Sequence, residues 1–171
     1  MDKIKLREKL KDIRASVSEK AKKNTAIRES LFLFLEQNFP KEKDIFIYES
    51  FGSEVDTWAI IDEALALGYR ILTPKVDKEF NMTAVCRFTG ESVQKTPAII
   101  IVPLLGFNKN LDRIGYGKGC YDKYFIANPH NVKIGLAYME QHCIFESEPH
   151  DISLDFIITP MIIFKGAGNS R

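Results

Sequence analysis

The chain has 171 residues, enough for one domain that buries a core without disulfide or metal staples. Its 24 basic and 23 acidic side chains leave a formal net charge of +1, which argues against a general nucleic-acid or membrane-surface binder. Three scattered cysteines without a CxxC pair argue against a disulfide framework or a zinc site, so we expect a reduced, cytoplasmic protein. The charged first residues predict no signal peptide, and the longest apolar runs, 98–107 and 156–164, are too short to span a membrane.

Two helices are expected at the start of the chain. Ser16 and Glu19 have the spacing of a capping box, so the second helix is expected to begin near residue 17 or 18 and to end before Pro40. The first helix has an apolar stripe at helical spacing, formed by Leu6, Leu10, Ile13 and Val17. The inner face of the second helix is expected to comprise Ile27, Leu31, Phe34, Leu35 and Asn38.

From residue 44 onward, short apolar segments alternate with helical ones. A helix at 57–67 is expected to have Asp56 as its N-cap and Gly68 as its C-cap, and Pro74 is expected to end the strand that follows. Strands are expected at 44–49, 70–73, 82–88, 98–105, 133–138 and 155–159, with a further helix at about 119–127. The alternation predicts a single α/β domain over residues 1–171, a three-layer α/β/α sandwich with a largely parallel sheet, and a loosely ordered tail at 165–171.

Residues 112–123 (DRIGYGKGCYDK) are the most informative segment, because they join a buried strand to a helix. Gly115, Gly117 and Gly119 remove Cβ atoms at alternate positions, so backbone N–H groups can approach an anion beside the positive end of a helix. Arg113 and Lys118 add positive charge, which completes a candidate phosphate cradle. The spacing matches neither the Rossmann nor the Walker pattern, so a tight turn with surface cations is the alternative.

Charged residues elsewhere fit the same chemistry. Asp122 falls on the first turn of the helix and is either a helix-start charge or a magnesium ligand between phosphates. Lys3 and Arg7 are four residues apart and share a helix face with Lys11 and Arg14, so they form either a phosphate-binding edge or a solvated basic face.

Four ordered blocks resemble 5-formyltetrahydrofolate cyclo-ligases. Residues 102–125, VPLLGFNKNLDRIGYGKGCYDKYF, are similar to the family signature, with Asn108 in place of its usual Asp and Cys120 in place of a Tyr. The other blocks are KIKLR at 3–7, SEVDT at 53–57, and the closing GLAY, PHD and LD groups at 135–138, 149–151 and 154–155. The segment 88–98 is shorter than in many members.

The resemblance implies an α/β architecture similar to sugar-phosphate isomerases and CoA transferases, and an enzyme of class EC 6.3.3.2. Such an enzyme converts 5-formyltetrahydrofolate and ATP to 5,10-methenyltetrahydrofolate, ADP and phosphate through a phosphorylated formyl intermediate, with ATP and Mg²⁺ required. Carried over position by position, it implies ATP contacts at Lys3, Ile4, Lys5, Leu6, Arg7, Arg113, Ile114, Gly115, Tyr116, Gly117, Lys118, Gly119, Cys120 and Tyr121. It implies catalytic roles for Arg113, Lys118 and Asp122, magnesium ligands at Asp122 and Asp151, and folate contacts at Glu49, Glu54, Tyr116, Gly117, Lys118, Gly119 and Cys120.

Two other functions remain open at this point. A sugar-phosphate isomerase or acyl-CoA transferase-like enzyme needs a carboxylate base or nucleophile, for which Glu54 is the obvious candidate. A nonenzymatic folate- or nucleotide-binding protein is compatible with the short 88–98 segment. We expect a monomer acting on a small molecule, with no nucleic-acid or membrane partner, and Phe51 and Trp58 as further candidates to pack on a flat pterin.

Overall fold

The computed structural model describes residues 2–167 and contains one mixed sheet of seven strands. The strand order is β3-β2-β1-β4-β7-β8-β9, and β1, β2, β4, β7 and β8 run parallel, with antiparallel β3 and β9 at the edges. The sheet strands are β1 (Asp44–Ile47), β2 (Arg70–Val76), β3 (Met82–Cys86), β4 (Ile99–Val102), β7 (Val132–Leu136), β8 (Phe156–Ile158) and β9 (Ile163–Lys165). The largely parallel α/β sheet is therefore confirmed.

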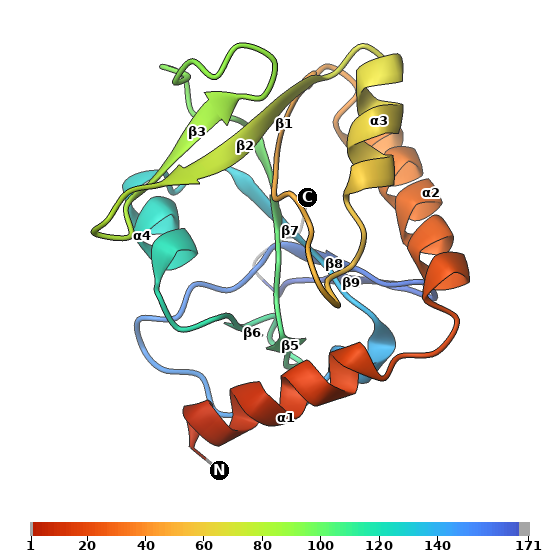
Figure 1. Cartoon of the computed structure of the whole chain (residues 1–171), viewed down its shortest axis with the longest axis vertical. Helices are drawn as coiled ribbons and strands as arrows, with labels where there is room; N and C mark the ends of the chain where they lie inside the picture. Colours follow the sequence, from red (N-terminus) through yellow and green to blue (C-terminus); the bar gives the residue numbers. More distant parts are fainter. Residues whose placement is uncertain (1, 168–171) are drawn as a thin grey trace.

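Helices cover both faces of the sheet (Figure 1). α2 (Lys20–Asn38) and α3 (Trp58–Ala66) lie on one face, and α4 (Cys120–Ala127) lies on the other. The central strand β4 is fully buried, with Ile99 and Ile101 in the core beneath α2 and α3, while Ile100 and Val102 face the α4 side. This two-sided burial explains the continuous apolar run, because successive side chains of a strand point to opposite faces.

The first helix, α1 (Lys3–Ala15), lies at the end of the sheet, beside a separate hairpin of β5 (Gly106–Phe107) and β6 (Arg113–Ile114) (Figure 1). Leu10 of α1 packs against Leu105 and Ile114 in a small apolar cluster. The short 3₁₀ helix η1 (Met139–Gln141) also contacts α1. This packing brings α1 to the carboxyl end of β4, where ligands bind in open α/β sheets.

Several boundaries differ from the sequence-based expectations. The capping box is wrong: α2 begins at Lys20, after Glu19 in a left-handed conformation, because Ser16 ends α1 and its hydroxyl donates to the Asp12 carbonyl. Strand β2 continues through Pro74 to Val76, because beyond Leu72 it pairs only with β3, and proline is tolerated where one side of a strand is unpaired.

Smaller differences concern polar residues. Asn38 is exposed rather than on the inner face of α2. Thr57 is the N-cap residue of α3, although the Asp56 carboxylate still accepts a hydrogen bond from Trp58 N at 3.0 Å. Lys165 belongs to β9 rather than to a loose tail, and residues 168–171 of that expected tail lie outside the described residues.

Among residues 2–167, no helix is both long enough and apolar enough to cross a lipid bilayer.

Candidate active site

A cavity of about 590 Å³ lies at the carboxyl end of β4. Pro103, which follows β4, forms part of its wall, and the edge hairpin of β2 and β3 contributes Pro74, Val76 and Met82. Residues 113–123, at the end of β6 and the start of α4, line the cavity continuously. The volume is in the range of small-molecule sites.

The glycine loop, residues 113–119, turns its backbone into this cavity. Gly117 and Gly119 have φ values of 92° and 72°, which only glycine adopts without strain. Within the described part of the chain, no oxygen accepts a hydrogen bond from the backbone amides of residues 115–122. Those amides therefore remain free to bind an anion at the N-terminus of α4.

Arg113 is the buried cation of the site. Its side chain is 8% exposed, and its Nε has no hydrogen-bond partner among the described residues. One guanidinium nitrogen reaches the Pro103 carbonyl at 3.4 Å, and another lies 3.9 Å from the Asp122 carboxylate. Burial lowers the Arg113 pKa, and Asp122 opposes that effect. A buried donor without a partner is costly, so Arg113 Nε is an unusual feature that calls for an explanation.

Helix α1 brings two further cations to the cavity. Lys3 and Arg7 both line it, and Arg7 Nε donates to the Gly115 carbonyl at 2.9 Å. The intervening Ile4 and Lys5 are exposed and Leu6 packs beside Leu10, so none of these three lines the cavity. The structure thus brings together Lys3, Arg7 and the glycine loop, as the spacing of the two cations predicts.

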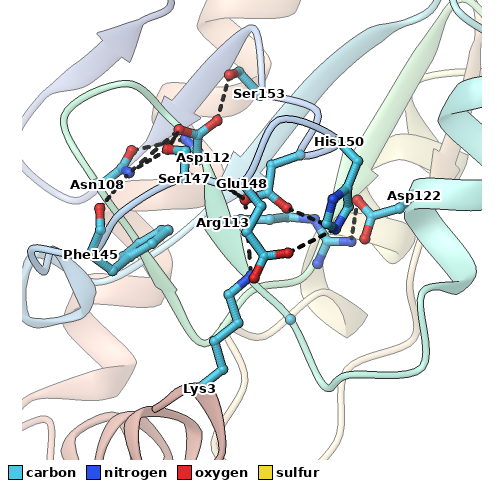
Figure 2. A network of polar contacts seen from close by, with 12 residues as sticks. Lys3, Asn108, Asp112, Arg113, Asp122, Phe145, Ser147, Glu148, His150 and Ser153 are labelled. Atoms are coloured by element: carbon cyan, nitrogen blue, oxygen red, sulfur yellow. Dashed lines mark hydrogen bonds and ion pairs between the residues drawn. The ribbon is translucent and has the colours of Figure 1, made fainter. Parts of the chain in front are cut away.

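The acidic residues gather on the same wall. Asp122 is 44% exposed and Asp151 is 17% exposed, and both line the cavity. Glu148, His150 and Asp151 offer ligand atoms that lie within 4.8 Å of one another. Lys3 Nζ lies 2.9 Å from Glu148 and 4.0 Å from Asp151, and the hydrogen bond from Lys3 lowers the pKa of the Glu148 carboxyl. These groups are shown in Figure 2.

Glu54 lies beside the glycine loop rather than in the cavity wall. Its side chain accepts hydrogen bonds from Phe51 N at 2.9 Å and from the Tyr116 hydroxyl at 2.8 Å. Burial and the Glu54 charge raise the Tyr116 pKa to about 12, so the phenol stays protonated and donates. Glu49 lies apart, 3.5 Å from Arg87, which stacks on the Trp58 ring.

Arg14 lies beside the glycine loop, but it does not line the cavity. It is 5% exposed, and its guanidinium donates to Ser53 Oγ at 2.9 Å and to the Leu104 carbonyl at 3.1 Å. It also lies 5.7 Å from the Tyr116 ring centroid. The expected basic face of α1 is therefore wrong for Arg14. Its position four residues after Leu10 could have indicated this burial, because residues four apart lie on the same face of a helix.

Comparison with known proteins places this arrangement in a family. The model of the 5-formyltetrahydrofolate cyclo-ligase family matches residues 85–160. A 5-formyltetrahydrofolate cyclo-ligase of Mycoplasma pneumoniae is 33% identical over 92% of this chain and 98% of its own length, and one of Mycoplasma genitalium is 34% identical over 82% and 86%. The chain belongs to the 5-formyltetrahydrofolate cyclo-ligase family.

A solved structure agrees with this assignment. The 5,10-methenyltetrahydrofolate synthetase from Mycoplasma pneumoniae superimposes with a TM-score of 0.85 at 31% identity, covering 94% of this chain and 99% of its own. The part matched by the cyclo-ligase family model contains the glycine loop, α4 and Asp151. Cys120, which departs from the family signature, is half-buried and lines the cavity.

Proposed function

We propose that this cyclo-ligase family member converts 5-formyltetrahydrofolate to 5,10-methenyltetrahydrofolate and releases ADP and phosphate from ATP. The row of unpaired amides at residues 115–122 is the observation that carries the proposal, because it forms an anion site on the cavity wall. The family relatives supply the substrate and reaction class. The three free cysteines support a cytoplasmic location.

The chemistry requires ATP because an amide-like formyl oxygen is a poor leaving group. Transfer of the γ-phosphoryl group to that oxygen converts it into a phosphate ester. The N10 amine then attacks the same carbon, and phosphate departs as the ring closes. The protein's part is to align the oxygen with the γ-phosphate and to neutralise its charge.

We assign the phosphate-binding work to the glycine loop and four cations. The amides of 115–122 bind phosphate oxygens, and Arg113 supplies its unpaired Nε from a buried position. Lys3 and Arg7 close the cavity from α1, and Lys118 adds charge at the loop's exposed edge. Buried donors stabilise developing charge more strongly than exposed ones, so Arg113 is the principal catalytic cation.

The folate is assigned to the side of the loop that faces Glu54. The Glu54 carboxylate can accept hydrogen bonds from pterin N–H groups. Its two oxygens already accept one hydrogen bond each, from Phe51 N and from the Tyr116 hydroxyl, and each has a further lone pair. The exposed rings of Phe51 and Trp58 flank this region and can pack on a flat heterocycle.

The donor set also fits magnesium. Mg²⁺ prefers oxygen ligands and is held by one or two carboxylates together with phosphate oxygens. Asp122 and Asp151 line the same cavity as Arg113, and both charges raise the Arg113 pKa against the effect of burial. The ion would neutralise phosphate charge, and Asp122 and Asp151 would hold it.

The test is a coupled assay of ADP release and of the near-ultraviolet absorbance of the methenyl product. We expect turnover only when ATP, magnesium and 5-formyltetrahydrofolate are all present. Asp122→Ala should lower kcat about 100-fold by removing a charge-neutralising ligand, whereas Asp62→Ala, on the exposed side of α3, should not. Phosphosugar turnover without ATP, or binding of both substrates without product, would instead support one of the two competing functions.

A further inference from the structure

Asp112 is a buried carboxylate that the proposed chemistry does not use. It is 4% exposed and directly precedes Arg113, at the end of the turn that joins β5 to β6. Its charge is met by neutral donors: the hydroxyls of Ser147 and Ser153 and, at 3.4 Å, the Asn108 amide. No ion pair with another described residue balances it. Burying a carboxylate is expensive, so these hydrogen bonds are the reason it is tolerated.

The two oxygens of Asp112 hold opposite ends of one segment, residues 147–153 (Figure 2). Oδ2 accepts from Ser147, and Oδ1 accepts from Ser153 at 2.6 Å. Asn108 strengthens the first end, since its amide also donates to the Phe145 carbonyl at 3.3 Å and to Ser147 Oγ at 3.2 Å. One backbone bond, from Leu154 N to Leu111 O, supports the second end.

The segment between these two ends has no helix or strand of its own. It carries Glu148, His150 and Asp151, whose side chains face the cavity wall. Inside the segment, Glu148 N donates to the Asp151 carboxylate at 2.7 Å, and Asp151 N donates to the Glu148 carbonyl. Among the described residues outside it, only the partly exposed Lys3 ammonium of α1 is ion-paired with these two carboxylates, at 2.9 and 4.0 Å. Because partly exposed ion pairs such as those of Lys3 hold a side chain only weakly, the position of Asp151 relative to Arg113 depends mainly on what fixes the segment's ends.

We infer that Asp112 is a positioning residue that fixes the 147–153 segment, and with it the Asp151 carboxylate, against the glycine loop. It touches no reacting atom. Asp112 links the two parts of the site because it is bonded covalently to Arg113 and accepts hydrogen bonds from Ser147 and Ser153. Its role in metal and nucleotide binding rests on the function proposed above, whereas the attachment of the segment does not.

The experiment measures the segment directly, by hydrogen–deuterium exchange of the 147–153 amides in the full chain without ligands. Asp112→Asn keeps the shape and removes the charge, and Ser153→Ala removes one attachment at an exposed residue, so it should fold even if the first variant does not. Loss of a charge-assisted hydrogen bond should speed exchange in this segment about tenfold. The control is Thr159→Val, which removes a buried hydroxyl that ties the distant β8–β9 turn.

The functional arm uses the same variants in the turnover assay. We expect the magnesium concentration for half-maximal rate to rise about fivefold in Asp112→Asn, with kcat within about twofold of the parent. Exchange that stays at the parent rate in both variants overturns the inference, as does faster exchange with an unchanged magnesium requirement. Failure of the proposed function would appear separately, as a parent chain without folate-dependent ADP release.

Discussion

At the residue scale, the proposed role of Lys3 as a phosphate ligand implies that Glu148 competes with nucleotide for it. The Lys3 ammonium lies 2.9 Å from Glu148 Oε1, yet the same ammonium is assigned to a phosphate. Both side chains are partly exposed, so solvent screens the ion pair and its contribution to stability is small. Even so, nucleotide binding must break or share it.

Glu148→Gln should therefore lower the apparent KM for ATP about two- to fivefold without a matching change in kcat. Steady-state kinetics at low ionic strength measure the effect, and added salt should reduce it. Glu146→Gln is the matched control, because it removes an exposed carboxylate two residues away. A raised KM in Glu148→Gln would mean that Glu148 itself helps to bind the metal–nucleotide complex.

Among individual residues, the sequence indicated candidate site residues where the residue type itself implies a chemistry. Glycines between cations predicted the phosphate cradle, and the i, i+4 spacing predicted that Lys3 and Arg7 act together. The burial of Arg14 and of Asp112 was not predicted, because an arginine on an amphipathic edge and an aspartate in a turn are usually solvated. Their burial depends on partners 39 and 41 residues away, Ser53 and Ser153, which no local pattern indicates.

At the element scale, the glycine loop combines backbone conformation with the docking of α1. Gly117 and Gly119 both have positive φ, so alanine at either position should cost about 1–2 kcal/mol in strain. Only at Gly117 would an added Cβ meet another group, the Arg7 guanidinium at 3.2–3.5 Å. The two glycines thus form a matched pair for separating strain from contact.

Gly117→Ala and Gly119→Ala should lose similar stability in chemical denaturation. Gly117→Ala should also raise the apparent KM for ATP about fivefold more than Gly119→Ala, because it displaces Arg7. Equal KM values in the two variants would show that Arg7 does not depend on this contact and would weaken its assignment as a phosphate ligand.

Periodicity predicted most elements of this fold but not their ends. The run at 98–105 correctly indicated a central strand, since only a strand covered on both faces tolerates four consecutive branched apolar residues. The start of α2 was wrong because Ser16 was already used by α1. The two-residue strands β5 and β6 were missed, because segments this short carry no periodic signal.

At the scale of the whole molecule, the alternation of strands and helices predicted the layers, whereas the position of α1 required the folded chain. Its apolar stripe shows only that one face is buried. Residues of five separate segments meet around the cavity: α1, the β2–β3 hairpin, Pro103 after β4, the glycine loop with α4, and 148–151. Their convergence follows from parallel strands ending at one edge of the sheet, which local sequence does not encode.

Strand β7 of the same sheet contains a buried cation, Lys133, whose desolvation opposes folding. Lys133 on β7 is 6% exposed, its ammonium donates to the Asn131 carbonyl at 3.2 Å, and burial lowers its pKa despite the nearby Asp155. Lys133→Met should therefore raise the free energy of unfolding at neutral pH by about 1 kcal/mol. Urea denaturation measures this difference, and Lys22→Met on an exposed face of α2 is the control.

The pH dependence distinguishes desolvation from packing as the cause. The folded-state pKa of Lys133 lies below its unfolded value of 10.5, so the unfolded chain binds more protons between the two values. The destabilisation is fully present below the folded pKa and is relieved as pH rises towards 10.5. The advantage of Lys133→Met should therefore shrink in alkaline buffer. A pH-independent advantage would instead mean that methionine simply packs better against Phe125.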